Sequence, residues 1–212
     1  AIASQGCSFA MMAEPPWQCP PNAASTYSWW RRVQPEFDFW KRAGIVETFA
    51  DVGGSVLDFA ATVHGLLAVV RTPDDGKARI CVNQAPQTNP VMATEPTSLP
   101  SPKTHAARLR RGDVQVREDL RKAFLHGRLT PGSRRYTAFI HPQWGLARLT
   151  SPNFGARGSP AITWVIGNAA AVVVAHVLGR IAVACGDAGL AAELDRTCLL
   201  YTSDAADEPR CV

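Results

Sequence analysis

The sequence lacks the residue patterns that build small metal-binding modules. Its six cysteines form no C-x-x-C pair and have no histidine at zinc-ligand spacing, which argues against a zinc site. The scattered cysteines favour a reducing compartment over a secreted, disulfide-bonded one. No segment reads as a signal peptide and no internal repeat is present, so we expect an intracellular protein.

Long hydrophobic runs are also scarce. One uncharged stretch, residues 161–179, is long enough to suggest a membrane span. It contains Asn168 and His176, small residues dominate its centre, and Arg180 follows at once. We therefore expect a buried helix and no membrane association, with a span as the alternative.

Charge is modest but unevenly placed. The formal net charge is +4, and because residues 198–212 carry −2, residues 1–197 carry +6. A basic surplus of this kind suits a polyanionic partner, although a solvated basic face is the alternative. The basic residues concentrate in two groups: Arg108, Arg110, Arg111, Arg117, Arg121, Lys122 and Arg128, and then Arg134, Arg135, Arg148 and Arg157.

The pattern of apolar residues and turn formers predicts an α+β fold. We expect a β-hairpin from residues 66–71 and 77–83, because Thr72-Pro-Asp-Asp-Gly76 between them has turn chemistry. A helix over 36–43 should stop at Gly44. Residues 1–30 show no period and receive no assignment. The remaining expected elements are a proline-rich connection over 86–102, helices over 104–111 and 160–178, a short helix or turn over 123–129, strands over 114–118, 136–140, 144–149 and 181–184, and a loop over 151–158.

Two short blocks have the features of a nucleotide site. The first is Asp119-Leu-Arg-Lys-Ala-Phe124, in which Asp119 follows a predicted strand. A carboxylate at a rigid strand end suits Mg²⁺, although a helix N-cap is the alternative. The second is Phe154-Gly-Ala-Arg-Gly-Ser-Pro-Ala-Ile162. Its glycines permit a close backbone approach, and Arg157 suits a phosphate group.

In this order and at this spacing, the blocks resemble motifs A and B of the reverse transcriptase palm of retroviruses and retrotransposons. The hairpin strand Lys77-Ala-Arg-Ile-Cys-Val-Asn83 resembles the fingers strand of the same family. The resemblance covers roughly residues 39–188. It implies a right-hand polymerase fragment, with an antiparallel sheet backed by helices, a fingers-like region over 31–112 and a palm-like region over 113–197.

The resemblance also implies site roles. Asp119 would hold a catalytic metal, Mg²⁺ or Mn²⁺, in a two-ion centre. Lys77 and Arg79 would bind the triphosphate of a deoxynucleotide, and Phe124 would exclude a 2′-hydroxyl. The motif B residues Gly155, Arg157 and Pro160 would line the template–nucleotide site. For Phe124 a purely structural core position is the alternative, and for Lys77 and Arg79 an exposed basic strand. The implied partners are an RNA or DNA template–primer and deoxynucleoside triphosphates.

The chain departs from the family at the second acidic motif, an aromatic, any residue, then Asp-Asp. At the expected distance it has Cys185-Gly-Asp-Ala188, so Asp187 is the candidate second metal ligand and catalytic residue, without the aromatic or the second Asp. Asn83 and Glu118 also differ from the family's usual Asp and apolar residue. Either this motif has decayed or the true motif lies beyond the given residues. In both cases the resemblance implies a retroelement fragment that is inactive by itself. A non-catalytic nucleic-acid-binding remnant and a chance translation are the alternatives.

The last fifteen residues have a separate origin in our interpretation. Residues 198–208, Cys-Leu-Leu-Tyr-Thr-Ser-Asp-Ala-Ala-Asp-Glu, resemble the translation of a sequencing adapter, and Cys211-Val212 fits the same adapter. We therefore expect the biological residues to end near position 197. Asp204, Asp207 and Glu208 consequently do not count as a carboxylate cluster.

Overall fold

The computed structural model describes residues 6–70, 78–93, 122–187 and 189. Several predictions fall outside them: the hairpin turn, Lys77, the helix over 104–111, the strand over 114–118, Asp119 and the tail. The chain forms two compact units. Among the described residues, the first contains 6–70, 78–93 and 124–162, and the second contains 122–123, 163–187 and 189.

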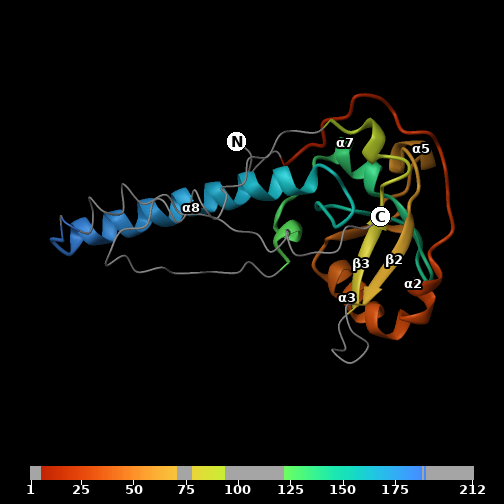
Figure 1. Ribbon diagram of the computed structural model, residues 1–212, viewed down its shortest axis with the longest axis horizontal. Coiled ribbons are helices and arrows are strands. Elements are labelled where there is room, and N and C mark those ends of the chain that lie inside the picture. Colours follow the sequence, from red (N-terminus) through yellow and green to blue (C-terminus); the bar gives the residue numbers. More distant parts are fainter. Residues whose placement is uncertain (1–5, 71–77, 94–121, 188, 190–212) are drawn as a thin grey trace. The chain divides into compact units, whose positions relative to one another are not determined.

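The first unit is a mixture of short helices and antiparallel strands (Figure 1). Its elements are α2 (Ala24–Ser28), α3 (Trp30–Arg42), β1 (Val46–Thr48), α4 (Phe49–Val52), α5 (Val56–Phe59), β2 (Gly65–Val70), β3 (Ala78–Asn83), η1 (Asn89–Val91), η2 (Ala123–His126, beginning at the unit boundary), α7 (Pro131–Arg134), η3 (Arg135–Thr137), β4 (Phe139–His141), β5 (Gly145–Leu149) and the start of α8 (Ser159–Ala184).

The strands form two antiparallel sheets. One is three-stranded in the order β1-β5-β4, and the other is the β2–β3 hairpin. The hairpin register pairs Gly65 with Asn83 and Val70 with Ala78, so the predicted hairpin is confirmed over the described residues. The strand predicted over 144–149 is also confirmed, as β5.

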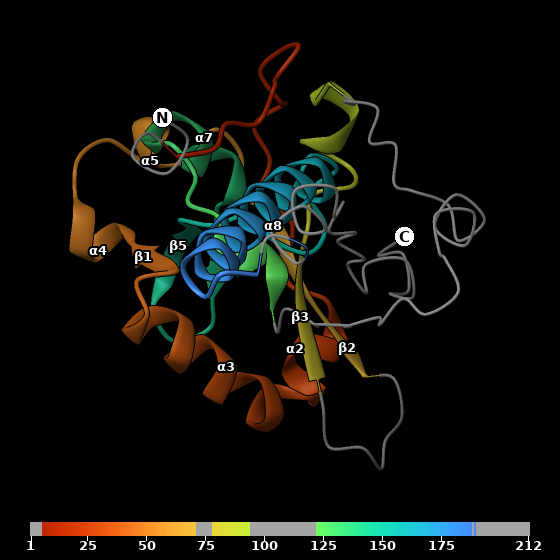
Figure 2. The ribbon, with the colours of Figure 1, turned by 90° about the vertical axis from the view of Figure 1, so that its left-hand side faces the viewer.

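Helix α3 joins the two sheets through one apolar stripe. Val33, Phe37 and Trp40 lie one helical turn apart and are buried, as expected for a helix that packs on one face. Phe37 contacts Trp40 and His141 edge-on, at ring-centroid distances of 5.3 and 4.7 Å. The same core includes Leu66 and Val82 of the hairpin, along with Phe139, Ala147 and Leu149 of the larger sheet. Figure 2 shows α3 with the strands of both sheets.

The predicted helix over 36–43 is confirmed but starts six residues earlier, at Trp30, and continues through Pro35. Proline removes one backbone hydrogen bond, yet the helix continues past it, with Val33 and Phe37 buried on either side. The predicted stop is confirmed. Gly44 has a φ of +66°, its N–H donates to the Lys41 carbonyl, and the Ile45 N–H donates to the Trp40 carbonyl, which is a Schellman ending.

One predicted strand begins late and another is wrong. Residues 136 and 137 belong to η3, so the strand predicted over 136–140 begins only at Phe139, as β4. The reason is the Thr137 hydroxyl, which accepts the Leu149 N–H at 2.9 Å and donates to the Arg134 carbonyl at 2.8 Å, so a side chain replaces a ladder bond. Residues 181–184 belong to α8. These residues continue the helix and form no strand, because no residue breaks the helix before Gly186.

Residues 6–23, which had no assignment from sequence, run along the first unit as a strap. The Cys7 N–H donates to the Arg128 carbonyl at 2.6 Å, and the Cys7 carbonyl accepts the Thr130 N–H at 2.9 Å. Further along, the amide of Asn22 bridges two strands: its Nδ2 donates to the Ile140 carbonyl and its Oδ1 accepts the Leu66 N–H, both at 2.9 Å. The strap is therefore an integral part of this unit.

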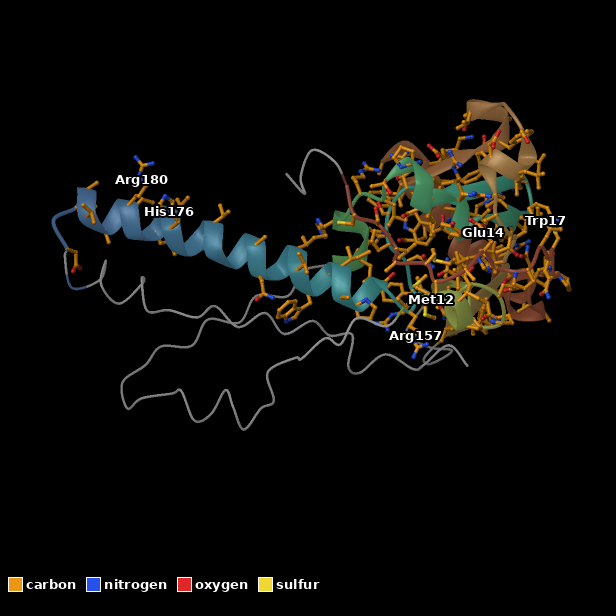
Figure 3. The ribbon with its side chains drawn as sticks, turned by 90° about the horizontal axis from the view of Figure 1, so that it is seen from above. Met12, Glu14, Trp17, Arg157, His176 and Arg180 are labelled. Carbon is orange, nitrogen blue, oxygen red and sulfur yellow. The ribbon has the colours of Figure 1, made fainter. Side chains whose placement is uncertain are left out.

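In the second unit, α8 continues from Thr163 to Ala184. His176 and Arg180, one turn apart, lie on the same side of the helix (Figure 3). The prediction of a buried helix is wrong here, because Val173, Val177 and Ile181 are exposed. Apolar residues on every side of a helix normally indicate burial, and these exposed residues depart from that rule. Among the described residues, no helix combines the length and apolarity needed to cross a membrane.

Candidate functional site

The glycine-rich loop between β5 and α8 is packed against the end of strand β3. The Val82 N–H donates to the Phe154 carbonyl at 3.3 Å. Gly155 has a φ of +112°, and a Cβ built there would collide with the Val82 carbonyl oxygen. The predicted close approach is therefore real, and in this structure the backbone that approaches is the protein's own β3. The predicted loop over 151–158 is confirmed, and α8 begins with Pro160 in its first turn.

Phe124 lies beside this loop. Its side chain is 6% exposed, and its ring meets the Phe154 ring edge-on, with 4.7 Å between centroids. The structure therefore brings together the aromatic residue of the first block and the loop of the second. Burial of this kind also fits the structural alternative, in which Phe124 supports Phe154.

Arg79 stands on β3 three residues before Val82 and is exposed. Three strand residues span about 10 Å, so Arg79 belongs to the strand that carries the loop contact. Its predicted companion Lys77 lies outside the described residues. Arg157 is exposed on the loop itself, and Figure 3 shows its side chain pointing away from the first unit. No described residue forms a hydrogen bond or ion pair with its guanidinium.

The three other arginines of the second basic group form ion pairs with glutamates of the protein. Arg148 is 8% exposed, pairs with Glu47 at 2.6 Å and stacks over the Phe59 ring at 4.2 Å. Arg134 contacts the same Glu47 at 3.3 Å, and Arg135 pairs with Glu14 at 3.6 Å. Counting charges in the sequence therefore overstated the basic surface in this part of the chain.

Arg128, from the first basic group, is also engaged. Its guanidinium donates to the Gly44 carbonyl at 2.6 Å, to the Thr150 hydroxyl at 2.7 Å and to the Ala43 carbonyl at 3.2 Å. It thereby satisfies carbonyls at the end of α3. Of the rest of that group, Arg108, Arg110, Arg111, Arg117 and Arg121 lie outside the described residues.

Asp187 lies just beyond the end of α8. Gly186 has a φ of +77°, its N–H donates to the Val183 carbonyl at 3.0 Å, and the Asp187 N–H donates to the Ala182 carbonyl at 2.9 Å. These are the two bonds of a Schellman ending. Asp187 is exposed, and its predicted companion Asp119 is outside the described residues. Among those that are described, no three His, Cys, Asp or Glu side chains gather into a group able to hold a metal.

A buried polar network supports the turn between β3 and η1. His64 is fully buried, and its Nδ1 lies 3.1 Å from Gln87 Oε1. Its Nε2 lies 3.0 Å from the Tyr136 carbonyl oxygen and 2.9 Å from the Thr88 hydroxyl. Burial lowers the pKa of His64. The Gln84 amide donates to the Tyr136 carbonyl at 2.8 Å.

Asn89 was not predicted as a site residue, yet it begins η1 and contacts the glycine-rich loop with both ends of its amide. Phe9 and Met92, whose side chains lie against Gly158, were not predicted either. The only signal was Asn89-Pro90 after a strand, which indicates a turn but says nothing of a partner 66 residues later.

Solved structures similar to this chain are protease–reverse transcriptases of foamy viruses. The native prototype foamy virus enzyme matches with a TM-score of 0.55 and 17% identity, over 76% of this chain and 20% of that one. Two foamy viral protease–reverse transcriptases in complex with double-stranded DNA match at TM-scores of 0.52 and 0.54, with 18% and 17% identity, over 75% and 79% of this chain and 25% and 32% of theirs.

This chain therefore spans about a third or less of the length of these matched proteins. At such identities the likeness establishes the fold alone: mixed helix and antiparallel sheet, reverse-transcriptase-like. No protein-family model matches the sequence, and no curated protein matches it either.

Proposed function

We propose that the chain is the fingers and palm part of a retroelement reverse transcriptase, whose parent protein synthesises DNA on a template by two-metal nucleotidyl transfer. The observation that carries the proposal is the contact of β3, Phe124 and the glycine-rich loop within a reverse-transcriptase-like fold. That two similar foamy viral proteins are complexes with double-stranded DNA supports a nucleic-acid partner. Residues 31–112 would be fingers and residues 113–197 palm.

In this proposal the exposed cations of the first unit bind phosphate. Arg79, with Lys77, holds the triphosphate of the incoming deoxynucleotide, since guanidinium and ammonium groups both suit phosphate oxygens. Arg157 contacts the template backbone from the loop. Gly155 and Pro160 shape the surface on which the base pair lies, and Phe124 excludes a 2′-hydroxyl by steric contact.

Asp119 and Asp187 are the proposed metal ligands. Carboxylate oxygens are the donors that Mg²⁺ prefers, and the exposed Asp187 carboxylate fits in donor type. Two bound ions would activate the attacking 3′-oxygen and stabilise the leaving pyrophosphate. The chain's own residues supply the binding and orientation of both substrates around that centre. Because the second Asp of the family's motif is absent, we expect no polymerase activity from the chain by itself.

A specific observation favours the second candidate, a non-catalytic remnant that binds nucleic acid. Asp187 follows a helix through a Schellman ending, whereas the family presents this carboxylate on a strand hairpin. A remnant would keep the cationic loop and have lost the metal centre. Its nucleic-acid binding would be salt-sensitive and independent of Mg²⁺.

The test is a pair of assays on the purified 212-residue chain. Fluorescence anisotropy with a labelled template–primer should show binding that weakens as salt rises. Mg²⁺-dependent primer extension should be undetectable. Extension that is abolished by Asp119→Ala would contradict the expected inactivity, and deoxynucleotide binding that requires Mg²⁺ would exclude the remnant.

A further inference from the structure

Asn89 holds the backbone of the glycine-rich loop by two hydrogen bonds from one side chain. Its Nδ2 donates to the Gly155 carbonyl at 2.7 Å, and its Oδ1 accepts the Arg157 N–H at 2.8 Å. A carbonyl at Gly155 and an N–H at Arg157 fit only one orientation of the amide, so the positions of its oxygen and nitrogen are determined. The amide therefore fixes the loop on both sides of Ala156.

Asn89 is itself held in place. Its own N–H donates to the Gln84 carbonyl at 3.0 Å, and the Thr88 N–H donates to the same carbonyl at 3.1 Å. The Thr88 hydroxyl reaches buried His64. Asn89 also opens η1, with Pro90 restricting the next backbone angle. The side chain thus extends from a rigid turn and loses little freedom when it binds the loop.

Packing of the neighbouring residues determines which way Arg157 points. Ala156 is 5% exposed and lies in an apolar cluster with Phe9 and Met92. A Cβ on Gly158 would lie 3.1 Å from both Phe9 and Met92, so the loop is also closely packed on that side. With Ala156 directed inward and Gly158 packed against the strap, the Arg157 side chain is directed outward into solvent.

We propose that Asn89 is a positioning residue for nucleic-acid binding: by fixing the backbone of Arg157, it presents that exposed guanidinium to the phosphate backbone of the template–primer. The identity of the ligand rests on the proposed function. The effect of Asn89 on the loop is independent of that function and is measured separately.

The first readout is the hydrogen-exchange rate of the Arg157 amide. Asn89→Ala removes both bonds, and exchange at Arg157 should rise about tenfold or more, since each bond contributes about 1 kcal/mol. Asn89→Asp keeps an acceptor for the Arg157 N–H and should retain most of the protection. The matched control is Asn22→Ala, which removes an equivalent pair of bonds to Ile140 and Leu66 and should leave Arg157 protected.

The second readout is template–primer affinity by anisotropy at fixed low salt. Asn89→Ala should weaken binding about threefold to tenfold, approaching the loss caused by Arg157→Ala, and the double variant should be no weaker than Arg157→Ala alone. Asn22→Ala should bind as the wild type does. Asn89→Asp is used for exchange alone because its added carboxylate would itself repel phosphate.

The outcomes separate the two proposals. If the wild-type chain binds, Arg157→Ala weakens it, and Asn89→Ala changes neither exchange nor affinity, the positioning role is overturned and the proposed function stands. If the wild-type chain does not bind, the proposed nucleic-acid function fails, and exchange at Arg157 still decides whether Asn89 positions the loop. If Asn22→Ala raises the exchange rate of the Arg157 amide as much as Asn89→Ala does, the effect is general destabilisation and the inference is wrong.

Discussion

The glycine-rich loop at 155–158 and the turn at 185–187 contain similar short patterns, a glycine with a positive φ one or two residues before a charged candidate site residue. At Gly155 the glycine is needed because the Val82 backbone occupies the space of a side chain. At Gly186 nothing lies within 4 Å of the position that a Cβ would take, and the glycine ends a helix. The first turn joins distant segments at a candidate site, and the second is a local helix ending.

Substitution of these two glycines should therefore destabilise the protein to different extents. Gly155→Ala should reduce the free energy of unfolding by about 4 kcal/mol, because backbone strain and a collision with Val82 add together. Gly186→Ala has only the left-handed backbone to accommodate and should cost about 1 kcal/mol. Urea unfolding of both variants measures the difference. Equal losses would remove the distinction between the two turns.

A second contrast separates the arginines by burial. Arg148→Ala should cost about 3 kcal/mol, because it leaves Glu47 without its shorter ion pair and exposes the Phe59 contact. Arg157→Ala, on the exposed loop, should change stability by less than about 0.5 kcal/mol. Thermal and urea unfolding test this prediction. A large stability loss in Arg157→Ala would show that its guanidinium has a structural role.

The core around α3 should weaken in acid. Desolvation lowers the pKa of His141 to about 4, with opposing contributions from Asp38 and Lys41, and its Nδ1 accepts the Gln143 and Trp144 N–H groups at 3.2 and 3.1 Å. As the pH falls, His141 is protonated in the unfolded chain first, near pH 6.5. The contribution of neutral His141 to the free energy of unfolding is therefore fully present above that pH. It should fall by about 2 kcal/mol between pH 6.5 and 4.

The control for this prediction is His141→Asn, whose side-chain oxygen can accept the same N–H groups but does not titrate. Its free energy of unfolding should depend less on pH over that interval than that of the wild type. An identical pH dependence would assign the acid sensitivity to other groups, among them buried His64, whose pKa burial also lowers.

The salt dependence of nucleic-acid binding should change only slightly in an arginine variant. If Arg157 contacts a phosphate, Arg157→Ala should reduce the slope of log affinity against log salt by about one. Arg135→Gln is a suitable comparison, because Arg135 already pairs with Glu14 and donates to the Leu57 carbonyl. Its slope should remain that of the wild type.

Local patterns predicted the elements whose causes are local. The hairpin, the stop at Gly44, the loop over 151–158 and the helix that begins near Pro160 all follow from turn formers and alternation, and the structure confirms them. The strand predicted over 136–140 begins later, at Phe139, because the Thr137 side chain replaces a ladder bond. The strand predicted over 181–184 is wrong, because α8 continues to Ala184.

Contacts between distant segments were not predictable in the same way. Asn22 binds backbone groups that are 44 and 118 residues away, and Asn89 binds backbone groups that are 66 and 68 residues away. A single side-chain amide leaves no periodic signal in the sequence. Charge counting likewise could not separate buried Arg148 from exposed Arg157. The roles of Asp119, Lys77 and Asp187 as ligands stay predictions.

We propose that the loop carrying Arg157 belongs to a nucleic-acid site on a reverse-transcriptase-like fold. The most direct test is anisotropy of a labelled template–primer with the 212-residue chain, wild type and Arg157→Ala, across a salt series. We predict salt-sensitive binding by the wild type and weaker binding with a reduced salt slope in Arg157→Ala. Absence of binding at low salt, or the same affinity and slope in both proteins, would contradict the claim.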